Sequence, residues 1–164
     1  MFAASTGSAT AALASLPEVA LVIDNIGYNY ANGRAAINLP QAYAYAVSPF
    51  SPHAVKLATA ESESSKDVIL HLPIDANQVN HLLGPGALRL EMTQTDVEAA
   101  LRKSLAAVPF VIGVNNYMGS RLTCETAHMC CLMEAIRQTG DLFFIASRTT
   151  TGSHASFEAK RANV

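Results

Sequence analysis

Residues with chemically useful side chains recur at the ends of apolar segments along this chain. A carboxylate and an amide stand together at Asp24 and Asn25, and an imidazole follows at His71. Two amides and a phenol occupy residues 115–117, and a hydroxyl and a guanidinium occupy residues 147–148. Together these groups are suited to binding a polar, oxygen-rich ligand such as a sugar.

The segments that position these residues are predicted to be buried parallel strands. Each is short, apolar and rich in β-branched or aromatic residues, and a polar or turn-forming cluster follows it. The predicted strands span residues 19–23, 42–47, 67–72, 110–114 and 142–146. Ligands of parallel α/β folds bind at the carboxyl ends of the strands, so the polar residues are expected to meet at one rim.

Helical patterns lie between the predicted strands. Thr93 and Asp96 have the spacing of a capping box at the start of one helix. A second helix is expected to begin at Thr123 and to end at Gly140, and Ser51-Pro52 is expected to open a third. Strands that alternate with helices imply right-handed crossovers, so the predicted class is α/β with a mainly parallel sheet and outer helices.

The composition indicates a soluble globular protein with a single domain. Of the 164 residues, 50% are hydrophobic and 15% are charged. The formal net charge is -2 and no basic stretch is present, which argues against a nucleic-acid partner. The apolar runs are far shorter than the roughly 20 residues of a membrane-spanning helix.

The amino-terminal segment has a different character from the rest of the chain. Residues 1–16 are rich in Ala, Ser and Thr and contain no Lys or Arg, so the positive region of an export signal is missing. We expect a disordered leader over residues 1–16 and one domain over residues 17–164. The three cysteines make an odd count and indicate no disulfide framework.

The polar residues also have simpler structural interpretations. Asp24 and Asn25 precede Ile26-Gly27 and could serve only to turn the chain, because both residue types bond to nearby backbone. His71 could be a core histidine whose ring is hydrogen-bonded. The adjacent amides Asn115 and Asn116 are harder to explain in this way, because both need partners as they leave a buried strand. The predicted convergence on one rim is what favours a functional site.

Five motifs, read together and in order, resemble a known family. They are VIDNIG at 22–27, HLPID at 71–75, GPGALRL at 84–90, GVNNYMGSRLT at 113–123 and FFIASRTT at 143–150. The chain resembles the divergent polysaccharide deacetylase family, a branch of the NodB-like carbohydrate esterases. The resemblance covers about residues 19–153, most of the chain.

The resemblance implies a distorted (β/α) barrel of seven strands. Its members hold a divalent metal, usually zinc, and remove acetyl groups from N-acetylated sugars. By this resemblance Asp24 is the general base, and the metal positions are Asn25, His71, Asp75 and Tyr117. The residues expected to orient the sugar or to stabilise an oxyanion are Asn115, Asn116, Ser147 and Arg148.

This chain departs from the family pattern at three polar positions. The family normally has an aspartate where this chain has Asn25, a histidine where it has Tyr117 and an aspartate where it has Ala146. An amide or a phenol, whose pKa is about 10, is a weaker zinc ligand than a carboxylate or an imidazole. We therefore expect a metal-dependent deacetylase of N-acetylated glycan with impaired activity. The alternative is a non-catalytic carbohydrate-binding relative, and a third interpretation is a gene fragment without a function of its own.

The length predicts an incomplete barrel that is truncated at the carboxyl end. Such barrels usually need about 200 residues or more, and five strands cannot close a barrel of seven. The family's later Gly-His-Pro motif, whose His is a candidate general acid, has no counterpart before Val164. Open sheet edges favour self-association. The resemblance implies an extracytoplasmic location, although the chain shows no export signal.

Overall fold

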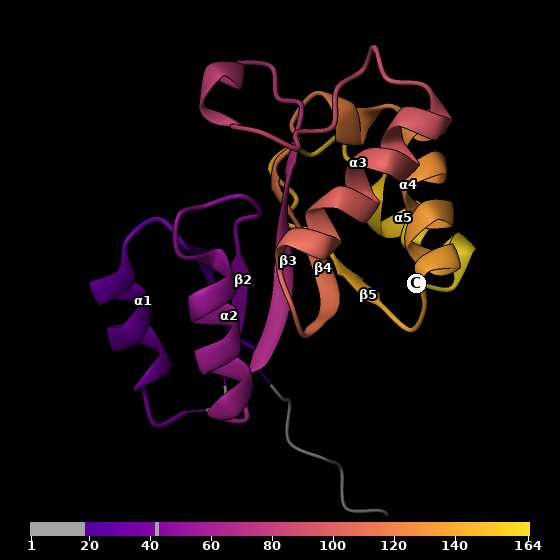
Figure 1. Cartoon of the computed structure of the whole chain (residues 1–164). Coiled ribbons are helices and arrows are strands. Elements are labelled where there is room, and N and C mark those ends of the chain that lie inside the picture. The colour runs from indigo at the N-terminus through magenta and orange to yellow at the C-terminus, as the bar shows by residue number, and fades with distance from the viewer. Residues whose placement is uncertain (1–18, 42) are drawn as a thin grey trace, which may run out of the picture.

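The computed structural model describes residues 19–41 and 43–164, which form one parallel sheet with helices packed against it (Figure 1). Neighbouring strands of the sheet follow chain order from first to last, and every pair is parallel. The strands are β1 (Val22–Ile26), β2 (Ala44–Val47), β3 (Asp67–Ile74), β4 (Val111–Met118) and β5 (Phe143–Ile145). The predicted α/β class with a parallel sheet is confirmed. The expected leader over residues 1–16 lies outside the described residues.

Among the described residues, four helices connect successive strands and a fifth follows the last strand. They are α1 (Tyr30–Ile37), α2 (Ala54–Glu63), α3 (Gln94–Ala107), α4 (Thr126–Thr139) and α5 (Ala155–Ala162). In Figure 1, α1 and α2 lie beside β2 near one end of the sheet, whereas α3, α4 and α5 group together toward its other end. Within the described ranges, no helix combines the length and the apolar character needed to cross a membrane.

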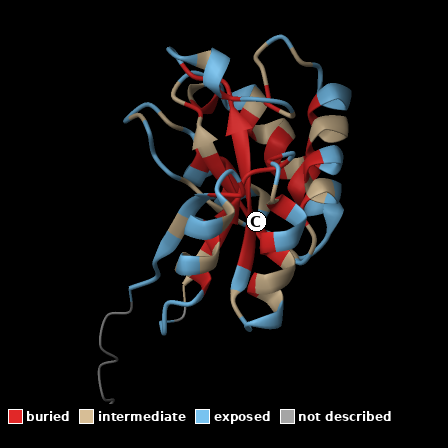
Figure 2. Ribbon diagram, turned by 60° about the vertical axis from the view of Figure 1, so that its left-hand side comes forward, coloured by how far each residue is buried: buried red, intermediate tan, exposed pale blue. Residues whose placement is uncertain are grey.

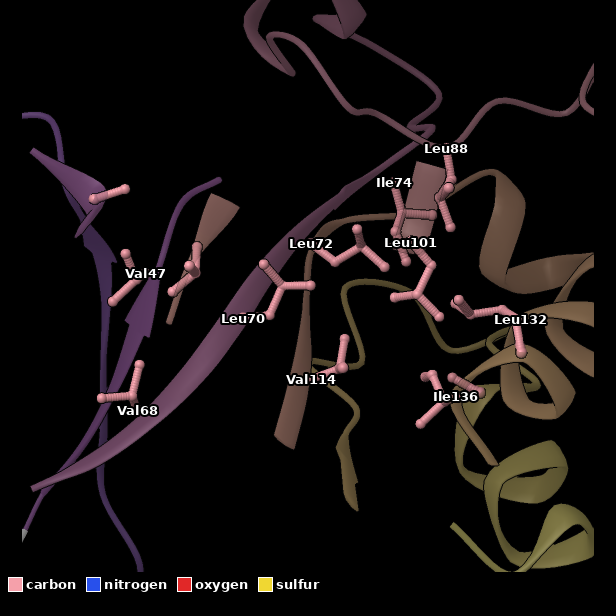
Figure 3. Packing of buried hydrophobic residues seen from close by; sticks show 14 of the residues in the cluster. Val47, Val68, Leu70, Leu72, Ile74, Leu88, Leu101, Val114, Leu132 and Ile136 are labelled. Atoms are coloured by element: carbon pink, nitrogen blue, oxygen red, sulfur yellow. The ribbon is translucent and has the colours of Figure 1, made fainter. Parts of the chain in front are cut away.

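The core lies between the sheet and the helices. Leu70 and Leu72 of β3 point toward Leu101 of α3, and Leu132 and Ile136 of α4 complete this part of the core (Figure 3). All five side chains are at most 1% exposed. Burial of an aliphatic side chain of this size contributes about 1.5–3 kcal/mol, so this layer holds the helices on the sheet. Figure 2 shows the same pattern, with buried strands inside and exposed surfaces on the helices.

The opposite face of the sheet carries smaller and more polar residues. Side chains alternate along a strand, and residues in register on parallel strands share a face. Ala46 is in register with Ile69, Ile69 with Gly113, and His71 with Asn115. We call this the inner face. A Cβ atom at Gly113 would lie 2.4 Å from the Phe143 ring, so only glycine lets β5 place its aromatic ring there.

Three strands run further than their apolar segments predict. β1 spans residues 22–26 and not 19–23, β3 continues two residues further to Ile74, and β4 continues four residues further to Met118. The extensions of β1 and β4 contain polar residues that face solvent or are paired across strands, and the extension of β3 contains Pro73 and Ile74, so the backbone ladder continues through all three. Several predicted site residues therefore lie on strands and not after them.

The helix starts were predicted with mixed success. The capping box at Thr93 is confirmed, because the Thr93 hydroxyl accepts from the backbone N–H of Asp96 and the Asp96 carboxylate accepts from that of Thr93. The prediction that Thr123 caps the next helix is wrong. Its hydroxyl donates to the Gly119 carbonyl oxygen at 2.7 Å, and α4 begins at Thr126 after a short 3-10 turn. The helix ends before Gly140, as predicted.

Candidate functional site

The end of β1 is bulged at the two residues predicted to carry chemistry. Ile23 is in register with Tyr45 and Ile26 with Val47, so β1 has one residue more than β2 between these pairs. Asn25 lies in this bulge with a φ of 57°, a left-handed conformation that asparagine tolerates better than most residues. Its side-chain amide donates to the Asp24 carboxylate at 3.0 Å. Bulges redirect side chains, and the side chains of Asp24 and Asn25 are both exposed here.

The chain after the bulge is held close to the start of α2. Gly27 has a φ of 124°, and a Cβ atom there would lie 1.9 Å from the Ser51 hydroxyl oxygen. Its carbonyl oxygen accepts from the backbone N–H of His53 at 3.0 Å. A residue other than glycine would push this turn away, so Gly27 sets where Asp24 and Asn25 lie relative to the next strand.

His71 lies on β3 at the centre of the sheet and is 2% exposed. Its Nδ1 atom is 2.7 Å from Oδ1 of Asn115, its register partner on β4. Its Nε2 atom is buried and has no hydrogen-bond partner among the described residues. Burial lowers the pKa of His71, while the bond to Asn115 and the charge of Asp24 raise it by less. The imidazole is therefore neutral at neutral pH.

Tyr117 lies beside His71 on the inner face. The two ring centroids are 5.1 Å apart, and the rings are inclined by 38°. Burial raises the pKa of Tyr117, and the nearby Tyr28 and Asp24 raise it further. The charge of Asp24 acts on both rings, so Asp24 lies on the same side of the sheet as the pair that His71 and Tyr117 form. The phenol is protonated in this pair, so it is a hydrogen-bond donor and a neutral oxygen.

Asn115 and Asn116, which are buried, and Ser147, which is exposed, form a hydrogen-bonded network that joins β4 to the end of β5. The Asn115 amide nitrogen donates to the Ile145 carbonyl oxygen at 3.1 Å and to the Ser147 hydroxyl oxygen at 2.9 Å. The Ser147 hydroxyl donates to the Asn116 carbonyl oxygen at 2.7 Å, and the Ser147 backbone N–H donates to the Asn116 side-chain oxygen at 2.8 Å. These polar groups are engaged with the protein itself.

Asp75, predicted as a metal position, is engaged elsewhere. Its side chain is 2% exposed, with Oδ1 3.2 Å from the Arg89 guanidinium and Oδ2 3.5 Å from that of Arg121. Its carbonyl oxygen also accepts from the backbone N–H groups of Arg121 and Leu122. Asp75 thus ties two loops together, and its charge is already compensated.

No three His, Cys, Asp or Glu side chains gather into a metal-binding group within residues 19–41 and 43–164. The four metal positions predicted from the family pattern do not share one set of contacts. His71 and Tyr117 lie together near Asp24, and Asn25 contacts Asp24, whereas Asp75 pairs with the arginines. Arg148 follows β5 as an exposed residue with a φ of 45°.

Three residues of the site region were missed by the sequence analysis. Arg89 and Arg121 lie within the recognised motifs, and their charge, opposite to that of Asp75, was a usable signal. Tyr28 is exposed and acts on Tyr117 electrostatically. Its signal was an aromatic residue directly after the turn glycine of the first motif.

Parallel strands in chain order, with outer helices and a polar cluster toward their carboxyl ends, define an α/β protein of the barrel type. The chain belongs to the divergent polysaccharide deacetylase family, whose model matches residues 21–164. The predicted resemblance is thereby confirmed.

Two relatives have no assigned function. The uncharacterized protein YibQ of Escherichia coli K12 is 34% identical over 147 residues, which cover 90% of this chain and 46% of YibQ. An uncharacterized protein of Haemophilus influenzae is 30% identical over 147 residues, which cover 90% of this chain and 52% of that protein. The chain spans about half the length of the curated relatives it matches.

A solved structure shares the fold. The crystal structure of the uncharacterized protein ATU2773 from Agrobacterium tumefaciens C58 matches with a TM-score of 0.81 and 20% sequence identity. The match covers 88% of this chain and 59% of that one. At this level of identity, the likeness establishes a common architecture and says nothing of a common reaction.

Proposed function

We propose that this chain is a metal-dependent hydrolase that removes acetyl groups from N-acetylated polysaccharide. Membership of the deacetylase family supports the reaction class. The single observation that carries the proposal is the His71 imidazole, whose buried Nε2 atom has no partner while Nδ1 is hydrogen-bonded. Histidines that bind metal ions almost always hold the other ring nitrogen in this way.

The residues around His71 fit a divalent ion, zinc or another, with weak affinity. Nε2 of His71 and the Asp24 carboxylate are the strong donors, and the oxygens of Asn25 and Tyr117 are neutral ones. We leave Asp75 out of this set because two guanidinium groups already pair with it. A bound ion would supply Lewis acidity at the acetyl carbonyl.

The chain's own residues have roles in the hydrolysis. Asp24 accepts a proton from water, whose oxygen adds to the acetyl carbon. The carbon–nitrogen bond then breaks, and the departing nitrogen takes up the proton that Asp24 received. The products are acetate and a free amine. The protonated Tyr117 phenol donates a hydrogen bond to developing negative charge, and Arg148 contributes positive charge at the rim. An N-acetylated glycan outside the cytoplasm is the substrate that we propose.

A non-catalytic carbohydrate-binding protein is the second candidate. The observation that favours it is the donor set, in which Asp24 is, among the described residues, the only carboxylate whose charge acts on His71, and the other donors, Asn25 and Tyr117, are neutral. Such a site holds an ion less firmly than one with two carboxylates or two imidazoles. In this case the same rim would bind glycan without a reaction.

Elemental analysis and an acetate-release assay separate the two candidates. The protein is refolded with excess zinc, brought to dialysis equilibrium with buffer that contains zinc, corrected for the zinc in that buffer, and tested on oligomers of N-acetylglucosamine. We expect close to one zinc per chain and release of acetate, with both lost in His71→Ala. His154→Ala, at an exposed histidine before α5, is the matched control and should behave like the wild type. Absence of zinc from the wild type would refute the enzyme and leave the carbohydrate-binding candidate.

A further inference from the structure

We propose that Asn115 is a positioning residue that keeps the proton of His71 on Nδ1 and leaves the Nε2 lone pair directed into the site. The sequence pattern assigned Asn115 to the sugar, whereas the contacts assign it to the histidine. This inference rests on the proposed metal-binding function, which it deepens by naming what prepares the ligand.

The orientation of the Asn115 side-chain amide follows from its neighbours. A backbone carbonyl oxygen can only accept a hydrogen bond, so the Asn115 atom 3.1 Å from the Ile145 oxygen must be the nitrogen. The Ser147 hydroxyl uses its own proton on the Asn116 carbonyl oxygen, so it too accepts from this nitrogen. Both observations select the same orientation.

The tautomer of His71 follows from that orientation. The Asn115 side-chain oxygen is left facing Nδ1 of His71 at 2.7 Å, and an amide oxygen only accepts. Nδ1 must therefore carry the proton. Nε2 is buried and has no hydrogen-bond partner among the described residues, so nothing there holds a second proton and Nε2 keeps its lone pair. A lone pair is what a metal ligand needs.

The burial of the two asparagines makes this arrangement firm. Asn115 is 5% exposed and Asn116 is 2% exposed, and both of the hydrogen-bonding atoms of the Asn115 amide are engaged. Turning the Asn115 amide over would place its oxygen against the Ile145 carbonyl oxygen and leave buried groups unpaired. An asparagine that contacts sugar would instead keep a donor or an acceptor free at the rim.

The protonation of the ring is measured directly by long-range proton–nitrogen NMR on the full chain with 15N-labelled histidine and no metal, at pH 8. The His71 signals are identified by their loss in His71→Gln. We expect a protonated Nδ1 and an unprotonated Nε2 in the wild type. Asn115→Asp keeps an acceptor and should keep the protonated Nδ1. Asn115→Leu removes the acceptor and should move the proton to Nε2 and weaken zinc binding by about 10-fold or more.

The control is Asn32→Leu, at an exposed asparagine of α1, which should change neither the ring signals nor the zinc affinity. A wild-type ring with its proton on Nε2, or an unchanged tautomer in folded Asn115→Leu, would overturn the positioning role whatever the zinc result. A protonated Nδ1 in a protein that binds no zinc would refute the proposed function and leave the tautomer assignment standing. If Asn115→Leu does not fold, the wild-type and Asn115→Asp spectra still show which ring nitrogen of His71 carries the proton.

Discussion

The two halves of the molecule treat their polar groups differently. In the half built on β3, β4 and β5, the amides of Asn115 and Asn116 and the hydroxyl of Ser147 are bonded to one another and to the backbone. In the half built on β1 and β2, Asp24 and Asn25 are exposed and bond to each other. There Glu61 of α2 is fully buried, and neither of its carboxylate oxygens has a partner among the described residues.

This contrast bears on how the proposed site works. His71 comes from the half that holds the Asn115–Asn116–Ser147 network, and its Nδ1 atom is bonded to Asn115, so its ring orientation is prepared before any ligand arrives. The negative charge comes from Asp24, in the half that is exposed and bulged. Orientation and charge are therefore supplied by separate parts of the fold, and substitutions should alter one without the other.

The largest expected effect concerns the unpaired acid of the first half. Burial raises the pKa of Glu61 to about 8 from an ordinary value of 4.5, so the folded protein keeps a proton that the unfolded chain releases. Stability from this group is complete below pH 4.5 and falls as the pH rises to about 8, by at most about 1.4 kcal/mol per pH unit. Glu61→Gln should remove this fall and be more stable than the wild type at pH 9, by on the order of 3 kcal/mol.

Urea unfolding at pH 5 and pH 9 measures this effect. Glu63→Gln, an exposed glutamate on the same helix, is the matched control and should keep the wild-type pH dependence. A Glu61→Gln variant that loses stability with rising pH as steeply as the wild type would show that Glu61 is paired in solution, and the contrast between the halves would be weaker.

A smaller effect compares one asparagine from each half. Asn116→Ala removes the acceptor of the Ser147 backbone N–H and the donor to the Met118 carbonyl oxygen at a buried position, and should reduce the free energy of unfolding by about 1–3 kcal/mol. Asn25→Gly removes an exposed side chain at a left-handed position that glycine adopts readily, so the change should stay within about 0.5 kcal/mol. Urea denaturation of the two variants tests this, and equal losses would contradict the contrast.

The smallest effect in free energy concerns the charge of the site. Asn25→Asp combined with Tyr117→His replaces two neutral donors by a carboxylate and an imidazole, and should strengthen zinc binding by about 10-fold or more. A factor of ten corresponds to about 1.4 kcal/mol. Titration of zinc against a competing chelator measures it.

The matched control makes the same two changes away from the site, as Asn32→Asp with Tyr43→His, and should leave the affinity unchanged. An unaltered affinity in the Asn25 and Tyr117 double variant would mean that these two positions do not face the ion.

The elements of the fold were predictable because their signals are local. The capping box at Thr93 and the strand cores around Ile69 and Val114 depend on residues close in sequence. Two strand ends were placed too early, because the polar residue Asn115 and the proline Pro73 were taken to follow the end of a strand. In the structure Asn115 pairs with His71 across the sheet, and both strands continue.

The site was predictable only in part. The convergence of Asp24, His71 and Tyr117 follows from parallel strands whose ends meet, and the motif order already indicated it. The pairing of His71 with Asn115 depends on the register between β3 and β4, which no local pattern reveals. The pairing of Asp75 with Arg89 and Arg121 depends in the same way on how two loops fold back over the end of β3.

The last strand, β5, is only three residues long, yet Asn115 reaches two acceptors at its end. If this edge of the sheet frays, both acceptors leave together and the Asn115 amide is free to rotate. The protonation pattern of a histidine two strands away then relaxes as well. The hydrogen bonds at the end of β5 and the position of the proton on His71 are therefore expected to be lost together.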